Sequence, residues 1–441
     1  MPRLTAWRVL RNGTQGLRDV NRFAEHEGLD ARDRALARRL VGTEIRRRAT
    51  LHTLVSAFTH KKPNPDVAAH LRLGFVQLFF LDGIRDHAAV SETVGAAHRT
   101  SGQGKARFVN AVLRAAQRAK REGLSGDPRR DLVGRDVHFD QPVFPDPAEH
   151  PLLWAEAALS MPAQLIKRWT KRYGAERTEA LAKLALEEPP LSVRVARGGR
   201  AELAEELASF EPREANHPNV LLFDAAHTEA LVHGDAFREG RITVQGETAL
   251  RAAELCQAEE GERVLELAAA PGGKTAVLAA SGARVIACDV NAGRLARLNE
   301  TVERLGLSDR VQAVASDGTQ ATRATSAEGA SFDAVFVDVP CSNTGVLAQR
   351  PEARWRYGPA SQRSLGELQA RLLREAAHEV RPGGRLVYST CSLEPEENAR
   401  CVASFLDEDG GWTLEDTHEA LPDHVNGPVD GGYAARLRKA T

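Results

Sequence analysis

The chain lacks the features of a membrane protein and of a secreted one. None of its apolar runs approaches the roughly 20 residues that a helix needs to cross a bilayer. The first residues, MPRLTAWRVLRNG, have no apolar core of the kind that a secretory signal carries. Its five cysteines follow no repeating spacing, which argues against a disulfide scaffold and against a zinc cluster. We therefore expect a protein of the reducing cytoplasm that has no membrane partner.

Further absences limit the architecture. The sequence has no internal repeat and no low-complexity tract, and none of its 14 histidines lies in a cluster with metal-ligand spacing. We therefore expect neither a repeat protein nor a metal site. At 441 residues the chain exceeds what one ordinary hydrophobic core covers, so it should fold into more than one domain.

The net charge of −1 hides two blocks of opposite sign. Residues 1–130 contain 25 Lys and Arg against 12 Asp and Glu, and the remainder of the chain is acidic. The basic block is a candidate for binding nucleic-acid phosphates. The alternative is that its arginines only solvate the outer faces of helices.

Hydrophobic periodicity predicts three domains of different class. Residues 1–130 show helical spacing and almost no strand signal, which predicts an all-α domain. Residues 131–240 open with a proline-rich stretch and then mix helical runs with two strand-like runs, at 191–195 and 219–223. This pattern predicts a linker and a small α+β module. Residues 241–441 alternate strands with helices, which predicts a Rossmann-like α/β domain with a mostly parallel sheet.

A glycine-rich turn follows the first strand of the predicted α/β domain, in VLELAAAPGGKT (264–275). Small residues there allow backbone N–H groups and a helix N-terminus to approach a polar ligand. Asp289 ends the next strand and is placed to bind the hydroxyls of a ribose. Asp317 ends the third strand, where it could meet an adenine amino group. The combination predicts a nucleoside-containing cofactor.

Two other nucleotide-binding motifs fit this turn less well. PGGKT resembles the end of the phosphate-binding loop G-x-x-x-x-G-K-[ST], but the first glycine of that motif would fall on Ala268. The dinucleotide fingerprint G-x-G-x-x-G is also missing at the turn. Both differences argue against an NTPase and against a dehydrogenase.

Two more strands end in polar turns that each carry a cysteine. Asp338 and Cys341 lie in FDAVFVDVPCSNTG (332–345), and Cys391 lies in GGRLVYSTCSLEPEEN (383–398). Because the carboxyl ends of parallel strands meet at one edge of a sheet, we expect both turns beside the cofactor turn. A thiolate that adds to C6 of a cytosine gives C5 the enamine character to accept a methyl group.

Cys391 is the stronger candidate for the nucleophile. Pro395, Glu396 and Glu397 read as the first turn of a helix, whose dipole would favour a thiolate at Cys391. The same glutamates would oppose that effect. Asp338 is placed to stabilise the charge that builds on the ring, whereas Cys256, Cys288 and Cys401 sit in apolar patterns typical of inert packing.

These segments resemble the NOL/NOP/Sun family of RNA cytosine-5 methyltransferases. The helical block resembles the NusB fold, through RDRALARRLVGTEIRRR (32–48) and HAAVSETVGAAHR (87–99). A NusB-like domain before this catalytic domain is the layout of the bacterial Sun type, whose members methylate a cytosine in small-subunit (16S) ribosomal RNA. The resemblance implies S-adenosylmethionine as cofactor and ribosomal RNA as partner, and we expect the protein to act as a monomer.

The resemblance also implies roles for individual residues. Cys391 matches the nucleophile, Cys341 matches the cysteine that assists product release, and Asp338 matches the acid that contacts both the cofactor and the base. The cofactor-binding residues that it implies are Ala268, Ala269, Ala270, Pro271, Gly272, Gly273, Lys274, Asp289, Asp317 and Asp338.

The chain departs from the family pattern at several positions. Glu266 and Ala268 replace the usual Asp and Cys of the cofactor loop, and Asn343 replaces a smaller residue. Residues 245–248 keep only the Gln of a Gln-Asp…Ser motif, and residues 430–433 lack the usual paired aromatics, which should loosen the pocket for the target base. We expect cofactor binding to survive, because backbone contacts dominate that loop.

Two alternatives to a 16S rRNA enzyme stay open. The same chemistry could act on transfer RNA, since only the resemblance favours ribosomal RNA. The helical block could also anchor a non-catalytic RNA-binding or antitermination-type protein. The intact Asp338, Cys341 and Cys391 argue against that second alternative.

Overall fold

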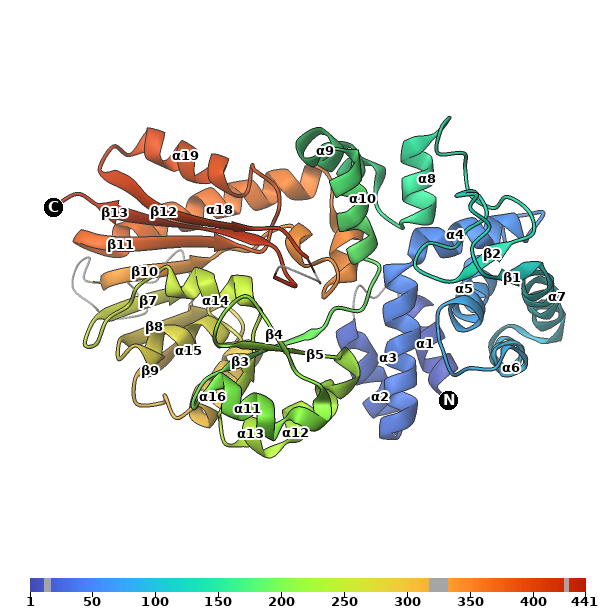
Figure 1. Ribbon diagram of the computed structural model, residues 1–441, viewed down its shortest axis with the longest axis horizontal. Coiled ribbons are helices and arrows are strands. Elements are labelled where there is room, and N and C mark those ends of the chain that lie inside the picture. The colour runs from blue at the N-terminus through green and yellow to red at the C-terminus, as the bar shows by residue number, and fades with distance from the viewer. Residues whose placement is uncertain (12–16, 317–331, 424–427) are drawn as a thin grey trace. The chain divides into compact units, whose positions relative to one another are not determined.

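A computed structural model describes residues 1–11, 17–316, 332–423 and 428–441 (Figure 1). Asp317, which we expect near the adenine, lies outside the described residues. The chain divides into two compact units, Met1–Glu187 and Glu188–Thr441. The predicted module 131–240 spans the boundary between these units, and the limits of the three predicted domains stay predictions. Within the described part of the chain, every helix falls short of the length and hydrophobicity of a membrane span.

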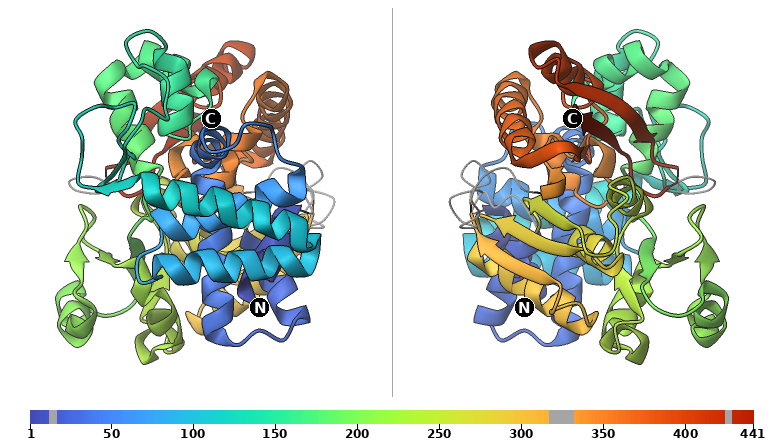
Figure 2. Two further views of the ribbon diagram at one scale, coloured as in Figure 1. Left: turned by 90° about the vertical axis from the view of Figure 1, so that its right-hand side faces the viewer. Right: turned by 90° about the vertical axis from the view of Figure 1, so that its left-hand side faces the viewer.

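The first unit opens with helices that pack around one buried helix. Their bounds are α1 Pro2–Arg11, α2 Leu17–His26, α3 Ala31–Arg46, α4 Arg48–Ala57, α5 Pro65–Phe79, α6 Asp86–Ser101 and α7 Gln103–Ala119. Helix α5 is the buried one, and the side chain of Asn64 caps it by accepting a hydrogen bond from the backbone N–H of Val67 at 2.9 Å. Helices α6 and α7 lie side by side on the outside of this bundle (Figure 2).

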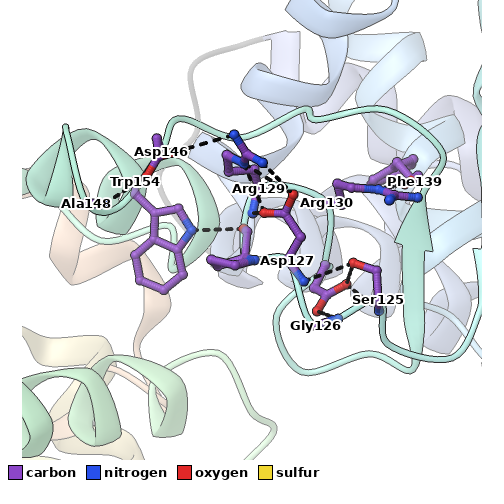
Figure 3. Close-up of polar contacts among 11 residues, drawn as sticks. Ser125, Gly126, Asp127, Arg129, Arg130, Phe139, Asp146, Ala148 and Trp154 are labelled. Atoms are coloured by element: carbon purple, nitrogen blue, oxygen red, sulfur yellow. Dashed lines mark hydrogen bonds and ion pairs between the residues drawn. The ribbon is translucent and has the colours of Figure 1, made fainter.

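The proline-rich segment after α7 is an ordered part of the first unit. It begins with the hairpin of β1 (Lys120–Glu122) and β2 (Val137–Phe139), and its loops are tied together by side chains (Figure 3). The guanidinium of Arg129 donates to Asp127 at 2.9 Å, and the indole N–H of Trp154 donates to the backbone oxygen of Pro128 at 3.0 Å. The unit ends with α8 Pro151–Ala158, α9 Ala163–Tyr173 and α10 Ala175–Leu184.

The second unit starts with a small antiparallel sheet that carries both strands predicted for this region. Its strand order is β4-β5-β3-β6, with bounds β3 Leu191–Val195, β4 Arg213–Glu214, β5 Val220–Phe223 and β6 Ile242–Val244. Short helices cover it, namely α11 Arg200–Glu206, η1 Ala208–Phe210, η2 Ala225–His227, α12 Thr228–His233 and α13 Asp235–Arg238. Arg304 joins this module to the larger sheet by donating to the backbone oxygens of Phe237 at 2.7 Å and Ile242 at 2.9 Å.

The larger sheet has the strand order β12-β13-β11-β10-β7-β8-β9. Its strands are β7 Arg263–Leu267, β8 Arg284–Asp289, β9 Val311–Ala315, β10 Phe332–Asp338, β11 Val380–Thr390, β12 Trp412–Ala420 and β13 Gly432–Lys439. The flanking helices are α14 Glu247–Glu254, α15 Gly273–Ala280, α16 Ala292–Arg304, η3 Thr344–Val346, η4 Pro351–Arg356, α18 Pro359–Glu379 and α19 Ala399–Glu408. The predicted Rossmann-like class is confirmed.

Alternate residues of each buried strand serve two hydrophobic cores, one on each face of this sheet. Leu265 and Val337 face the core that α18 and α19 cover, whereas Val264 and Phe336 face the core that α15 and α16 cover (Figure 1). Burial on both faces explains why these strands read as continuous apolar runs.

The order of the strands sets the position of the site. Strand β7 pairs in parallel with β8 on one side and with β10 on the other, so the chain reverses its direction of winding at β7. A crevice opens where the connections after two neighbouring strands diverge, at their carboxyl ends. Strands β12 and β13, which the sequence patterns did not reveal, extend the sheet beyond β11 through antiparallel pairing.

Candidate active site

The turn between β7 and α15 is built so that backbone approaches the crevice. Gly272 has φ +98°, and a Cβ at this position would lie 3.0 Å from the Cγ atom and 3.2 Å from the Cα atom of Leu298. Only glycine satisfies both constraints. The backbone N–H of Ala269 donates to the carbonyl oxygen of Cys288 at 2.9 Å, which ties the turn to β8. Gly272 and Gly273 therefore put no side chain of their own in front of the first N–H groups of α15, and the side chain of Gln245 comes within 3.7 Å of where a Cβ of Gly273 would lie.

Asp289 lies at the end of β8 beside this turn, as its place in the sequence predicts. Its carboxylate accepts hydrogen bonds from the backbone N–H groups of Ala270 at 3.2 Å and Asn291 at 3.0 Å. It also forms an ion pair with Arg294 at 3.2 Å, and its side chain is only 1% exposed. The structure thus places Asp289 at the turn but commits its oxygens to groups of the protein.

Lys274 and Asp338 form an ion pair at the mouth of the crevice. The Nζ atom of Lys274 lies 2.6 Å from the Oδ2 atom of Asp338, and the hydroxyl of Ser389 donates to Oδ1 at 2.8 Å. Burial opposes the charge of Lys274, but the carboxylate of Asp338 outweighs it and raises the pKa of the lysine. Both side chains keep some exposure, 19% for Lys274 and 32% for Asp338, so a bound molecule can reach them.

Glu266 lies beneath this pair with almost no access to solvent. Burial raises the pKa of Glu266 to about 8, and the nearby negative charge of Asp338 acts in the same direction. The base of the crevice therefore holds a carboxyl group that is largely protonated at neutral pH, next to one lysine cation and one aspartate anion.

Cys341 and Cys391 meet at the same edge of the sheet. Their Sγ atoms lie 3.2 Å apart, although 50 residues separate them in the chain. Cys341 is buried and Cys391 is half-buried. The hydrogen bond with Cys391 and burial together raise the pKa of Cys341 well above the usual range of a thiol. Cys341 therefore keeps its proton, and Cys391 is the more accessible sulfur of the two.

A buried carboxylate that we expected only in the first turn of a helix joins the two cysteine turns. Glu397 is 2% exposed, and its carboxylate accepts hydrogen bonds from the hydroxyls of Ser342 and Ser392 and from the backbone N–H of Ser342 at 3.0 Å. Each serine directly follows one of the cysteines. The repeated Cys-Ser pair was the signal in the sequence that could have revealed this link.

One prediction about Cys391 is wrong. Residues 395–398 form a turn, and helix α19 begins only at Ala399, so the cysteine does not precede a helix N-terminus directly. The backbone of this turn is held by side chains instead. Asn398 accepts from the hydroxyl of Thr390 at 2.6 Å and donates to the carbonyl oxygen of Ser392 at 2.8 Å. The helix dipole therefore gives no reason for a thiolate at Cys391.

Three glycines pack closely around the backbone of the Cys391 turn. Gly345 donates its N–H to the carbonyl oxygen of Cys391 at 3.0 Å, and Gly431 donates to Gly345 at 2.8 Å. A Cβ at Gly432 would lie 2.5 Å from the carbonyl oxygen of Thr390 and 3.3 Å from the Cα atom of Cys391. The segment that we expected to loosen the base pocket is thus packed closely against the cysteine turn.

The two segments that depart most from the family pattern contact each other. The hydroxyl of Thr248 donates to the carbonyl oxygen of Asp430 at 2.7 Å, and a Cβ at Gly246 would lie 2.1 Å from the Oδ2 atom of Asp430. The carboxylate of Asp430 therefore occupies the space that a side chain at position 246 would need.

Comparison with known proteins decides the family. The model of the 16S rRNA methyltransferase RsmB/F family matches residues 253–430, and the NusB family model matches residues 5–118. The ribosomal RNA small subunit methyltransferase B of Pseudomonas putida is 32% identical over 461 aligned residues, which cover 99% of this chain and 98% of the relative. This chain belongs to the RsmB/F family of 16S rRNA methyltransferases.

Other relatives agree with this family. The probable ribosomal RNA small subunit methyltransferase B of Bacillus subtilis is 31% identical over 388 residues, which cover 86% of this chain and 81% of the relative. The crystal structure of a methyltransferase homolog protein from Pyrococcus horikoshii is 24% identical, with a TM-score of 0.55, and covers 66% of this chain and 99% of that protein. This second likeness shows the fold.

As an RsmB/F protein, the chain is an rRNA methyltransferase with a NusB-type helical domain, and S-adenosylmethionine is its cofactor. The residues of the crevice fit that group chemically. The amino-acid end of S-adenosylmethionine carries one ammonium and one carboxylate, and Asp338 and Lys274 offer the opposite charges at 2.6 Å from each other. Gly272 and Gly273 add no side chain at the start of α15, where backbone N–H groups can approach a polar ligand.

Proposed function

We propose that the protein methylates C5 of a cytosine in 16S ribosomal RNA through a covalent bond between Cys391 and C6 of the base. The observation that carries this proposal is the 3.2 Å contact between the sulfur atoms of Cys391 and Cys341. Methyl transfer to a nitrogen or to a hydroxyl has no use for two thiols at the site. Transfer to C5 of a pyrimidine needs one sulfur to activate the ring.

The cofactor is proposed to lie across the turn from Ala268 to Lys274. Lys274 would bind its carboxylate and Asp338 its ammonium, while the backbone of Ala268, Ala269, Ala270, Pro271, Gly272 and Gly273 lines the turn. When bound, S-adenosylmethionine supplies the methyl group on a positively charged sulfur. Asp289 would bind the ribose once Arg294 releases it, and Asp317 stays the proposed adenine-side acid.

The proposed reaction starts at Cys391. Its thiol passes its proton to the carboxylate of Asp338, and its sulfur adds to C6 while the electron pair of the C5–C6 double bond moves into the ring. Asp338 then gives that proton to ring N3, where negative charge builds. The thiol of Cys341, which keeps its proton, can donate its S–H to the neighbouring thiolate.

Release of the product reverses the first step. Once C5 carries the methyl group, a base removes its remaining hydrogen, the C5–C6 double bond re-forms and the C6–S bond breaks. The sulfur of Cys391 leaves with the electron pair of the C6–S bond. Because the sulfur of Cys341 lies 3.2 Å away, its S–H is placed to give a proton to the departing sulfur. Acid assistance of this kind makes a thiolate a better leaving group.

The outer face of α7 is proposed to bind the RNA backbone. This helix contains no acidic residue, and Arg107 and Arg118 are exposed on the face that points away from its buried residues. Phe108 is 42% exposed beside them. The neighbouring helix α6 adds the exposed His98 and Arg99 in its last turn. Positive charge next to an exposed aromatic ring suits phosphates and an unstacked base.

Bisulfite sequencing after reaction in vitro tests the proposal. The protein is incubated with S-adenosylmethionine and, separately, with 16S rRNA, small ribosomal subunits or transfer RNA. We expect one new 5-methylcytosine in 16S rRNA. Methylation of transfer RNA alone would assign the other substrate. If no RNA gains 5-methylcytosine although calorimetry shows that the cofactor binds, the cytosine-5 proposal fails.

A further inference from the structure

Asn343 lies between the two cysteines and contacts both of them. Its Nδ2 group donates a hydrogen bond to the carbonyl oxygen of Cys341 at 2.7 Å. Its Oδ1 atom accepts one from the sulfur of Cys391 at 3.3 Å.

The backbone and its hydrogen bonds fix the direction of this side chain. Asn343 has φ +61°, in the left-handed region that asparagine adopts more readily than most residues. Because Nδ2 is bound to the carbonyl of Cys341, the amide oxygen must point toward Cys391. The Nη1 atom of Arg350 lies 3.3 Å from the same oxygen and holds it from the other side.

We propose that Asn343 is a positioning residue for Cys391, whose amide oxygen accepts and directs the S–H bond of the nucleophile. This inference rests on the proposed role of Cys391 as nucleophile. An amide oxygen can accept a hydrogen bond from a thiol, but its lone pairs repel a thiolate. The amide oxygen is therefore a better partner for the S–H group than for a thiolate, and a change of side chain at position 343 should alter how readily the sulfur gives up its proton.

Two titratable groups act on this sulfur directly, namely Lys274 on α15 and Cys341 after β10. Further charged groups lie one contact away: Asp338 and Asp430 act on Lys274, Glu397 acts on Cys341, and Arg350 contacts Asn343 itself. All of these residues are retained in a variant at position 343, so a difference between such variants reports the side chain at that position.

Two substitutions change the contact in opposite directions without disturbing the backbone. Asn343→Gly removes the side chain, and glycine accepts φ +61° without strain. Asn343→Asp keeps the shape and tolerates the same φ, but it places a carboxylate where the amide oxygen was. The glycine variant should ease ionisation of Cys391, and the aspartate variant should oppose it.

The rate at which iodoacetamide alkylates Cys391 measures this directly, because only the thiolate reacts. The rate is followed by peptide mass spectrometry between about pH 6 and pH 10, at ionic strength held constant. We expect the midpoint of the Cys391 profile to fall by about half a pH unit in Asn343→Gly and to rise by about one pH unit in Asn343→Asp. Cys401, half-buried and in the same digest, serves as the internal control and should keep its profile.

Two results would overturn the inference. One is a midpoint that moves in neither variant, and the other is a shift in the same direction in both, which would mean a general disturbance of the turn. The measurement needs neither RNA nor methyl donor. A protein that fails to methylate cytosine can therefore still show the opposite shifts, and a working methyltransferase can still fail to show them.

Discussion

The sulfur of Cys391 lies 3.2 Å from the sulfur of Cys341, at the ends of two strands that pair side by side in the sheet. The parallel register of β10 and β11 brings Asp338 opposite Ser389, so the turns that follow both strands start from the same level. This register, rather than any local sequence feature, makes one reactive centre from two motifs.

The first prediction separates the roles of the two thiols. Cys391→Ala should lower methylation by at least about a thousand-fold, because no other side chain can replace the sulfur that activates the ring. Cys341→Ala should still form the bond to C6 but release it slowly, so that a protein–RNA conjugate survives on a denaturing gel. Cys401→Ala is the control with both thiols intact. Normal turnover in Cys391→Ala would contradict the mechanism.

The second prediction concerns the carboxylate that joins the two cysteine turns. Glu397→Gln should destabilise the protein by about 1–3 kcal/mol, because one amide oxygen cannot accept all the hydrogen bonds that Ser342 and Ser392 donate to the carboxylate. Methylation should fall with it. The matched control is Glu396→Gln, whose side chain is 45% exposed and pairs with Arg400 at 3.0 Å. Chemical denaturation should show a change below about 0.5 kcal/mol for this control, and equal losses in both variants would refute the role of Glu397.

The third prediction is a dependence of stability on pH. The pKa of Glu266 is about 8 in the folded protein and 4.5 in the reference state, so between these values the folded protein holds a proton that the unfolded chain has lost. Stability from this group is therefore complete below about pH 4.5 and is lost as the pH rises to about 8. Glutamine at position 266 does not titrate. The free energy of unfolding of Glu266→Gln, relative to that of the wild type, should therefore rise by a few kcal/mol between pH 5 and pH 9. Urea unfolding at both pH values measures this, and a difference that is the same at both would contradict it.

The fourth prediction uses two glycines with opposite surroundings. Gly432→Ala should cost about 1–3 kcal/mol and reduce methylation, because its Cβ would lie 2.5 Å from the carbonyl oxygen of Thr390 and push against the turn of Cys391. Gly366→Ala, inside α18 with no heavy atom within 4 Å of the new Cβ, should instead stabilise by about 0.5–1 kcal/mol. Thermal unfolding measures the stability change of each variant and its sign. Two losses of equal size would mean that close packing at Gly432 is not the cause.

The fifth prediction tests the basic face of α7. Arg107→Gln and Arg118→Gln should each weaken RNA binding and reduce the slope of log affinity against log salt by about 0.7–0.9 for every phosphate contact that is lost. Lys183→Gln removes the same charge from α10, where Lys183 pairs with Glu179 at 2.8 Å, and should leave the slope unchanged. Fluorescence anisotropy with a 16S fragment over a range of salt concentrations measures these slopes. If the slope of log affinity against log salt is equal in all three variants, α7 does not contact the RNA backbone.

Much of the architecture could be predicted because its signals are local. The continuous apolar runs of β7, β8 and β10 reflect burial on both faces of the sheet, and the glycines after β7 mark a turn that no side chain can occupy. Strand β12 escaped prediction because it lies at the edge of the sheet, where most of its side chains meet solvent and the apolar run disappears.

The sequence by itself determined which chemical groups exist and which strand ends they follow: two thiols, one aspartate and a glycine turn. Only the tertiary structure decided how those groups are engaged. In the folded protein Asp289 pairs with Arg294, helix α19 begins at Ala399, and Glu397 joins the two turns through hydrogen bonds. The reason is physical, since hydrogen bonds between residues dozens of positions apart depend on strand register and packing, which no local pattern records.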